Sequence, residues 1–285
     1  MVTTRNLEFD DQAPWGRYTP TMWHGLLLAA SQRVPPLLHR LVFALRRPIK
    51  YHVDHALDVT IWNLKLRLLP RGNMSEIKLL FAPQLFDREE LSLLGAALPV
   101  GGVFVDVGAN AGVYTFWALR CVQAGGRVLA VEPDPEMRRR LAFNLRSNSA
   151  DNVEVCPVAL SDSQGEGELL INPSQRGENT LARDEALRAG GDRMVHRVRL
   201  QTLLGLLVEH GVARIDALKI DIEGHEPAVL GHFFAHAPRT IWPSLAITEY
   251  KPSTAAAIEH LFVSHGYRRV LSNGLNLAFR RESIA

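Results

Sequence analysis

Cysteine is scarce in this chain, with only Cys121 and Cys156 among 285 residues, and neither belongs to a CxxC pair. Metal-ligand spacing is therefore missing, and we expect two reduced, buried thiols. No apolar run approaches the about 20 residues that a membrane-spanning helix requires. The first residues also lack the charged start, apolar core and cleavage site of a signal peptide. These absences exclude a disulfide scaffold and a transmembrane span, and they favour a cytoplasmic protein.

A strong net charge is also missing, since the formal charge at pH 7 is +2. The basic residues form no long run with interleaved aromatics, so we expect no nucleic-acid partner. Acids are absent between Asp11 and Asp54, whereas basic residues occur there, and Pro35 and Pro36 divide the segment into two short helical pieces. Residues 23–50 could contact an anionic membrane surface, or their helices could pack on the rest of the chain or on a second subunit in a homodimer. The basic residues are Arg17, Arg33, Arg40, Arg46, Arg47 and Lys50.

Residues 57–100 carry a different pattern from the basic segment. Apolar and polar residues alternate between Asp58 and Pro70, which predicts a small β-hairpin. We expect a turn at residues 70–74 and then a helix that opens at residues 87–91 with Asp87 as its N-cap. The chain is thus divided into a basic helical segment (1–56), a hairpin with a lead-in helix (57–100) and a larger domain (101–285).

From residue 103 onward, strand-like and helix-like segments alternate, which predicts a Rossmann-like α/β fold with helices on both faces of a mostly parallel sheet. Residues 161–200 interrupt the alternation, and we predict an inserted hairpin there, formed by strands 167–171 and 195–200 with a long mobile loop at 172–193. Asn273 and Gly274 form a hairpin turn that makes the last of seven strands antiparallel. The predicted strands of this sheet are 103–107, 127–131, 153–158, 215–220, 243–248, 267–271 and 275–280, and the helices are 112–123, 135–147, 202–210, 226–236 and 253–265.

The strand at 103–107 runs into a turn with glycines at 108 and 112, a pattern that brings the backbone close to a ligand and frees N–H groups at the following helix. Asp106 lies in an otherwise apolar strand and needs a donor such as a ligand ammonium group. Glu132 ends the next strand, where an acid binds a ribose diol. A ligand with a carboxylate, an ammonium and a ribose is S-adenosylmethionine rather than a dinucleotide, although the glycines could instead only shape the turn. The predicted cofactor-binding residues are Asp106, Gly108, Ala109, Asn110, Gly112, Tyr114, Glu132, Asp134, Ala159 and Asp162.

A second polar group follows the strand at 215–220. Asp221, Glu223 and His225 fall within one short loop and are candidates for work on a substrate hydroxyl, whereas Glu226 suits the first turn of the next helix. Glu249 follows the neighbouring strand and should lie beside Asp221. These carboxylates could hold a divalent cation or accept a proton, and the sequence leaves both alternatives open. The predicted catalytic residues are Asp221, Glu223, His225 and Glu249.

Four stretches of the chain resemble the FkbM-type methyltransferases over roughly residues 57 to 280: 105–115, 131–135, 158–162 and, most specifically, 218–226. The resemblance implies a class I S-adenosylmethionine-dependent enzyme that methylates a hydroxyl of a sugar or another natural product. The chain departs from the family at Leu204, where an acid is usual, and at His225, where relatives often have a small residue. Acceptor recognition is expected in 161–200, in the turn 71–74 and in the N-terminal segment.

Two other functions remain as alternatives. An NAD(P)-dependent oxidoreductase could use the same turn, but Asn110 stands where the middle glycine of its fingerprint would be. A catalytically dead binding module of the same fold is the other alternative, and it would leave the acidic loop without a purpose.

Overall fold

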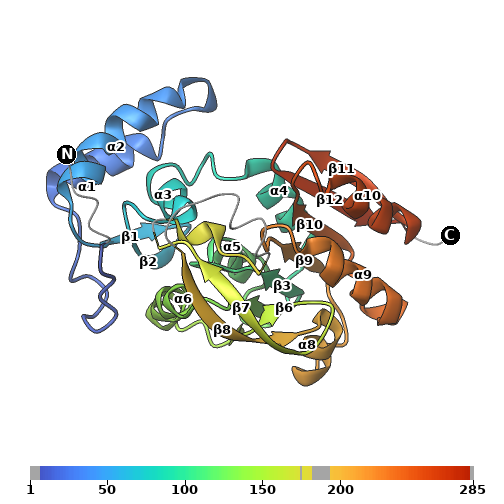
Figure 1. The fold of residues 1–285 in the computed structure, drawn as a ribbon. Coiled ribbons are helices and arrows are strands. Elements are labelled where there is room, and N and C mark those ends of the chain that lie inside the picture. The colour runs from blue at the N-terminus through green and yellow to red at the C-terminus, as the bar shows by residue number, and fades with distance from the viewer. Residues whose placement is uncertain (1–6, 174, 182–192, 283–285) are drawn as a thin grey trace.

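The computed structural model describes residues 7–173, 175–181 and 193–282. Its centre is a seven-stranded sheet with the order β11-β12-β10-β9-β3-β4-β5, and all neighbours are parallel except where β12 pairs with β10 and β11 (Figure 1). This topology confirms the predicted Rossmann-like fold with its antiparallel final strand. The strands are β3 (Val103–Val107), β4 (Arg127–Val131), β5 (Val153–Cys156), β9 (Ala217–Ile220), β10 (Leu245–Glu249), β11 (Tyr267–Ser272) and β12 (Asn276–Arg281).

Helices cover both faces of this sheet because alternate strand residues point to opposite sides. Phe104, Val128 and Leu245 face one core with α4 and α5, whereas Val105 and Leu218 face a second core with α8, α9 and α10. Both faces are therefore apolar, as expected for a buried parallel sheet. The helices are α4 (Arg88–Ala97), α5 (Val113–Val122), α6 (Pro135–Ser147), α8 (Leu203–Glu209), α9 (Glu226–His236) and α10 (Ala255–Ser264).

The predicted insertion forms a separate small sheet. β7 (Gly165–Ile171) and β8 (Met194–Gln201) pair as an antiparallel hairpin, and the short β6 (Ala159–Leu160) joins the edge of β8. The hairpin crosses the front of the central sheet in Figure 1. Most of the predicted mobile loop at 172–193 lies outside the described residues, but residues 175–181 are described and return to β7 through a bridge between Leu170 and Thr180.

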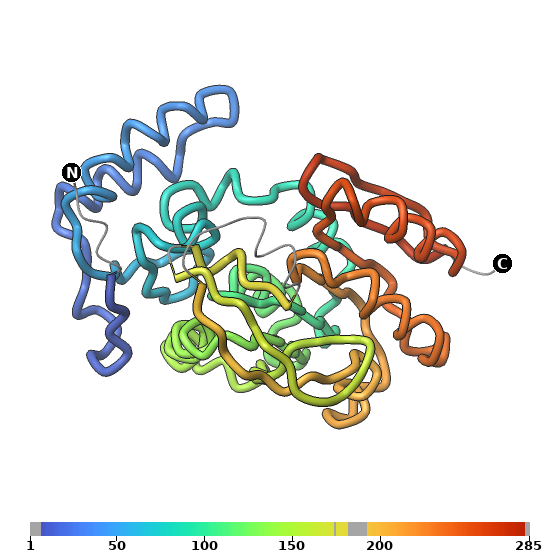
Figure 2. The backbone as a smooth tube through the Cα atoms, viewed as in Figure 1, coloured from blue at the N-terminus to red at the C-terminus, as the bar shows by residue number. Residues whose placement is uncertain are grey.

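The N-terminal part consists of α1 (Met22–Ser31), the short η1 (Pro36–Leu38) and α2 (Arg40–His52), followed by the hairpin of β1 (Leu57–Ile61) and β2 (Leu64–Leu68). α1 and α2 lie side by side and project from the edge of the molecule (Figure 2). Leu28 and Ile49 are buried in the core that includes one face of the sheet. Ser31 donates a 2.6 Å hydrogen bond to the carbonyl of Phe81, which ties α1 to the following helix α3 (Met74–Phe81). Within the described residues, no helix is long and apolar enough to cross a membrane.

The turn predicted at 70–74 is present as a bend at residues 70–72, but α3, which begins at Met74, was not predicted; the Asn73 side chain starts it by accepting hydrogen bonds from the free N–H groups of Ser75 and Glu76 as an N-cap. Two local predictions were wrong. Asp87 stands before α4 but has a left-handed backbone (φ 33°) and makes no capping bond, and its carboxylate instead accepts a 2.9 Å hydrogen bond from Tyr114. The third strand ends at Cys156, and residues 159–160 pair with the insertion instead.

Candidate functional site

The glycine turn lies at the carboxyl edge of β3, next to the end of β9. Gly108 (φ 78°) has no room for a side chain, since an added Cβ would lie 1.9 Å from the carbonyl oxygen of Asp221. Gly112 (φ 96°) caps α5, and a Cβ there would lie 2.4 Å from Leu141. The first glycine therefore allows two strand ends to meet at the site, whereas the second serves the packing of α5 against α6.

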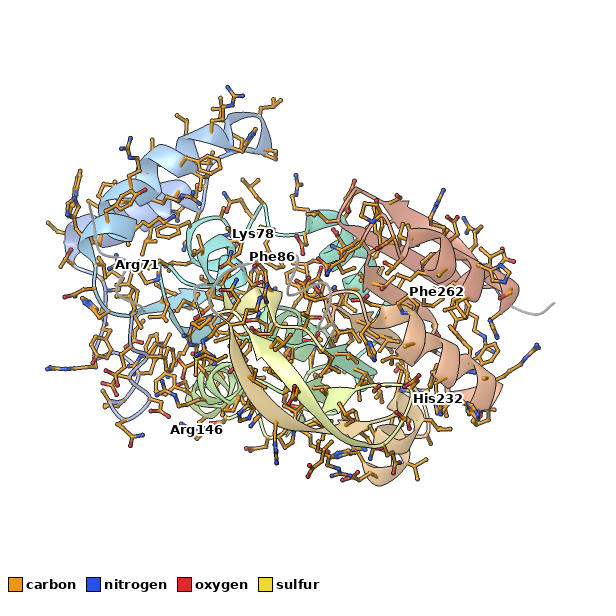
Figure 3. All side chains as sticks on the ribbon, viewed as in Figure 1. Arg71, Lys78, Phe86, Arg146, His232 and Phe262 are labelled. Atoms are coloured by element: carbon orange, nitrogen blue, oxygen red, sulfur yellow. The ribbon has the colours of Figure 1, made fainter. Side chains whose placement is uncertain are left out.

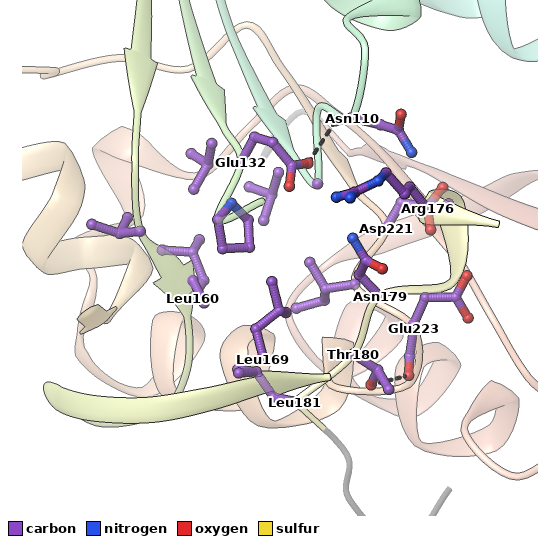
Figure 4. Close-up of a pocket in the computed structure, with 18 residues that line it drawn as sticks. Asn110, Glu132, Leu160, Leu169, Arg176, Asn179, Thr180, Leu181, Asp221 and Glu223 are labelled. Carbon is purple, nitrogen blue, oxygen red and sulfur yellow. Dashed lines mark hydrogen bonds between the residues drawn. The ribbon is translucent and has the colours of Figure 1, made fainter. Parts of the chain in front are cut away.

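A narrow cavity of about 50 Å³ lies beside this turn, and Asn110 and Glu132 line it. The Glu132 carboxylate accepts hydrogen bonds of 2.7 Å from the backbone N–H groups of Asn110 and Asp134 (Figure 4). Burial outweighs these bonds and raises the pKa of Glu132 to about 7. The carboxylate is thus held at the end of β4, with acceptor capacity left for the hydroxyls of a ribose.

The opposite end of the narrow cavity is apolar. Ala159 and Leu160 of β6 line it together with Leu169 of β7 and Leu181 (Figure 4). Such a slot suits the flat, weakly polar ring of an adenine. The insertion, which we expect to recognise the acceptor, contributes a wall of the narrow cavity.

Asp134 anchors that wall. Its carboxylate is buried, accepts two bonds from Arg176 (2.7 and 2.9 Å) and one from Asn179 (2.8 Å), and also caps α6 through the N–H of Glu136. The predicted cofactor ligand Asp134 thus lies behind the cavity and holds the segment 176–181 over it. We name this contact the Asp134–Arg176 latch.

A wide cavity of about 410 Å³ adjoins the narrow one on the other side of the turn. A row of polar side chains crosses the otherwise apolar sheet at this point, because Asp106 pairs in register with Lys219, and Glu249 with Asn276. Burial raises the pKa of Asp106 to about 6, although a 2.6 Å hydrogen bond from Thr115 acts to lower it. Asp106 lines this cavity, where a ligand ammonium would stabilise its charged form.

Asp221, Glu223 and Glu249 bring one carboxylate oxygen each within 4.8 Å of one another, and we name this group the acidic cluster. Burial, and then the charge of Asp221, raises the pKa of Glu249 to about 10 and that of Glu223 to about 7. Burial also opposes ionisation of Asp221, but Lys219 lowers its pKa below the usual value. Asp221 and Glu249 are therefore a hydrogen-bonded pair in which Glu249 is the more basic member and shares its proton with Asp221, and Glu223 is more basic than an ordinary glutamate.

Two lysines that the sequence reasoning missed balance the acidic cluster. Lys219 is 2% exposed, its Nζ lies 3.1 Å from the Asp221 carboxylate, and Asp221 raises the pKa of Lys219 despite burial. Lys251 places its Nζ 3.2 Å from the Glu223 carboxylate. A charged residue within the apolar strand 217–220 was the available signal for Lys219, and it is the same signal that pointed to Asp106.

Some of the remaining predicted residues line one of the two cavities and others lie outside both. His225 does not line either cavity, because its Nε2 lies 3.1 Å from the hydroxyl of Ser161, and burial lowers its pKa. Asp162 is exposed and accepts bonds from neighbouring serines. Ala109 and Tyr114 line the wide cavity. Asn73, which the sequence did not single out, donates to Asn110 at 2.5 Å and so ties α3 to the glycine turn.

The strand order, the glycine turn and the acids at the carboxyl ends of β3, β4 and β9 define a class I methyltransferase fold. Residues 106–269 match the family described as "Methyltransferase FkbM domain". The chain belongs to the FkbM methyltransferase family. This confirms the resemblance seen in the sequence, and the family supports S-adenosylmethionine as the methyl donor.

Two curated relatives are similar over part of the chain. The AMB antimetabolite synthetase AmbE of Pseudomonas aeruginosa is 33% identical over 190 residues, which are 55% of this chain and 9% of that protein. The methyltransferase sdnD of Sordaria araneosa is 32% identical over 160 residues, which are 47% of this chain and 61% of that protein. The chain thus spans less than two thirds of either relative.

Solved structures give weaker likenesses. Precorrin-6y C5,15-methyltransferase from Geobacter metallireducens has a TM-score of 0.39 at 14% identity, covering 68% of this chain and 88% of that one. Fibrillarin from Aeropyrum pernix in complex with S-adenosylmethionine has a TM-score of 0.41 at 12% identity, covering 67% and 74%. The fold assignment rests on the strand order rather than on these scores.

Proposed function

We propose that the protein is an S-adenosylmethionine-dependent O-methyltransferase that acts on a hydroxyl of a small molecule. The observation that carries the proposal is the acidic cluster, which lines a cavity of about 410 Å³ directly beside the glycine turn. An alcohol is a poor nucleophile until its proton leaves, so an O-methyltransferase needs a proton acceptor next to the donor site. A transfer to a more basic nitrogen would not need this group of carboxylates.

The cofactor is assigned to the narrow cavity, the turn and the part of the wide cavity that Asp106 lines. Glu132 would accept the ribose hydroxyls, the apolar wall with Ala159 and Leu160 would cover the adenine, and Asp106 would pair with the ammonium group. The bound cofactor supplies an electrophilic methyl group on a sulfonium. Gly108, Asn110, Asp221 and Glu223 line both cavities, so the turn and the acidic cluster would lie between donor and acceptor.

Glu223 is the proposed general base. Its pKa of about 7 leaves it half ionised at neutral pH, which is where a base combines availability with proton affinity. Its backbone has a left-handed conformation (φ 57°), which is unfavourable outside glycine and typical of a functional position. Glu249 would share its proton with Asp221, and Lys219 would favour the ionised form of Asp221.

We propose proton transfer rather than binding of a divalent cation for this cluster. Hard cations are held by ionised carboxylates, but Lys219 and Lys251 each already form an ion pair with one of the three acids. The site is therefore already neutralised, so a divalent cation would gain little. Activity that survives treatment with a chelator would support this proposal, and loss of activity that is restored by added magnesium would contradict it.

The proposed function is tested with methyl-labelled S-adenosylmethionine and a panel of alcohols, phenols, amines and thiols. We expect label only in products with a new C–O bond, and we expect Glu223→Gln to bind S-adenosylhomocysteine but transfer the methyl group about 10² to 10⁴-fold more slowly. The exposed Glu166→Gln is the matched control and should keep full transfer. Labelled amines without labelled ethers would refute O-methylation.

A thermal shift separates the alternatives, because a ligand stabilises a protein that binds it. A methyltransferase should be stabilised by S-adenosylhomocysteine and unaffected by NADP, and the oxidoreductase alternative requires the opposite. A dead binding module of the same fold would give no shift. The cytoplasmic location, the homodimer and the division at residues 56 and 100 stay predictions.

A further inference from the structure

A third cavity, of about 260 Å³, lies between α2 and the segment from α3 to the start of α4. We name it the α2–α3 groove. It shares three lining residues, Lys78, Phe86 and Asp87, with the wide cavity that contains the acidic cluster. Lys78 and Phe86 lie next to each other below the α1–α2 pair in Figure 3. The groove therefore adjoins the wide cavity, with Lys78, Phe86 and Asp87 as their common wall.

The walls of the groove are mostly apolar. Val42, Ile77, Phe81 and Phe86 are at least nine-tenths buried, and Phe43 contributes a ring that is 52% exposed. The other lining residues on α2 and beside it are His39 and Arg46. An apolar groove that adjoins a polar cavity is suited to a ligand that is apolar along part of its length and polar at the reacting end.

Positive charge lies along the same groove. The guanidinium of Arg46 stacks over the ring of Phe43 at 4.4 Å, and Lys78 lies 5.8 Å from the ring of Phe86. The sequence from residue 12 to 53 has no acid, so no carboxylate of α1 or α2 opposes Arg46. The single acid of the groove, Asp87, accepts a hydrogen bond from Tyr114 at the junction with the wide cavity. An anionic group at the α2 end would meet a cation that no carboxylate of α1 or α2 neutralises.

We propose that the α2–α3 groove binds the methyl acceptor, and that this acceptor is an amphiphile with three parts. Its hydroxyl reaches the acidic cluster, its apolar arm lies against Ile77, Phe81 and Phe86, and its anionic group lies beside Arg46. Small-molecule sites commonly measure about 300–1,000 Å³, and the wide cavity of about 410 Å³ stays within that range when the adjoining groove of about 260 Å³ is added. The proposal rests on the proposed function and names the class of its substrate.

A series of ω-hydroxy carboxylic acids with 6 to 12 carbons is a direct probe, measured by calorimetry with S-adenosylhomocysteine present. Each added methylene that enters the groove should tighten binding about four-fold until the groove is filled. The series without the carboxylate, the matching 1-alkanols, should bind more weakly at each length. Affinity that is independent of chain length would overturn the proposal.

Arg46→Glu and Phe43→Ala test the groove itself, and both residues are partly exposed, so neither change removes a buried contact. Arg46→Glu should weaken binding of the hydroxy acids at least ten-fold and leave binding of the 1-alkanols unchanged, whereas Phe43→Ala should weaken binding of both series. Arg47→Glu, an exposed neighbour on α2 that does not line the groove, is the charge-matched control. An equal effect of Arg46→Glu and Arg47→Glu would mean that only the net charge matters, which contradicts the proposal.

Two further outcomes separate the groove from the proposed function. Tight, length-dependent binding without any methyl transfer would keep the groove and refute the O-methyltransferase. Methyl transfer to sugars that is unaffected by Arg46→Glu and Phe43→Ala would keep the function and refute the groove. A change in sedimentation or in binding to anionic vesicles, with unchanged probe affinity, would assign this surface to a second copy or to a membrane and would also overturn the proposal.

Discussion

The carbonyl oxygen of Asp221 occupies the position that a side chain at Gly108 would need. An added Cβ would lie 1.9 Å from that oxygen, and Gly108 also has a φ of 78°, which disfavours other residues. The contact joins the end of β3, which carries the cofactor turn, to the end of β9, which carries the acidic cluster. The proposed donor and acceptor sites can therefore adjoin each other because Gly108 has no side chain.

Gly108→Ala should lower the free energy of unfolding by more than about 2 kcal/mol, because both the contact and the backbone angle become unfavourable. It should also abolish the thermal shift caused by S-adenosylhomocysteine. Denaturant unfolding measures the first effect. Gly231→Ala in α9 is the control, since nothing lies within 4 Å of its added Cβ, and it should stabilise the protein by about 0.5–1 kcal/mol. Equal effects of the two changes would contradict the assigned role of Gly108.

Methyl transfer should rise with pH through about 7, because Glu223 must lose its proton before it can accept one from the acceptor. Glu223→Gln should reduce the rate by about 10² to 10⁴-fold and remove this limb of the profile. Single-turnover rates at saturating cofactor between pH 5.5 and 8.5 provide the measurement. A limb that persists in the Glu223→Gln variant would assign the base to another residue.

Lys251→Met should move the same limb to higher pH. Lys251 lies 3.2 Å from the Glu223 carboxylate and lowers the pKa of Glu223, so its removal should raise that pKa. The maximal rate above the new pKa should remain close to that of the wild type. An unchanged midpoint would show that Glu223 does not govern the profile.

Affinity for S-adenosylhomocysteine should fall as the pH drops from 8 to 5.5. Glu132 has a pKa of about 7 and binds a ribose best as a carboxylate, so its protonation removes acceptor capacity below that value. Calorimetry at several pH values should show the loss, and Glu132→Gln should bind weakly at every pH with a flatter dependence. Tight binding by Glu132→Gln at pH 8 would refute the ribose assignment.

Arg176→Ala should accelerate exchange of S-adenosylhomocysteine. The narrow cavity of about 50 Å³ is smaller than a nucleoside site, so the segment 176–181 must move when a ligand enters or leaves. The Asp134–Arg176 latch holds that segment, and its removal should raise both rate constants about ten-fold. Stopped-flow fluorescence measures them, and Arg197→Ala on the exposed face of β8 is the control. Unchanged rates would mean that the latch does not limit exchange.

Much of the fold could be predicted because the signals are local. The alternation of apolar segments located the strands of the central sheet, and Asn273–Gly274 located the final hairpin. α3 escaped prediction because its start depends on a single cap, Asn73, that resembles an ordinary turn residue. We predicted Asp87 as an N-cap because aspartate is a common capping residue. In the structure its carboxylate instead accepts a hydrogen bond from the buried phenol of Tyr114 on α5.

The sequence predicted which acids belong to the candidate site but not how all of its residues are arranged. Asp221, Glu223 and Glu249 meet as expected, since parallel strands end at one edge of the sheet. His225 belongs to the same loop but faces Ser161, because α9 begins there and turns the chain away from the cavity. Lys219 could be recognised as a partner of these acids only from the strand order, in which β9 lies between β3 and β10.

The sequence by itself determined the class of fold, the glycine turn and the supply of carboxylates at the strand ends, because each depends on residues close together in the chain. Only the tertiary structure decided which acids share a proton, which lysines balance them and how the α2–α3 groove joins the wide cavity. These properties depend on burial and on distances between elements far apart in sequence. Burial and neighbouring charges bring the pKa of a carboxylate such as Glu223 close to neutral pH. Both exist only in the folded chain.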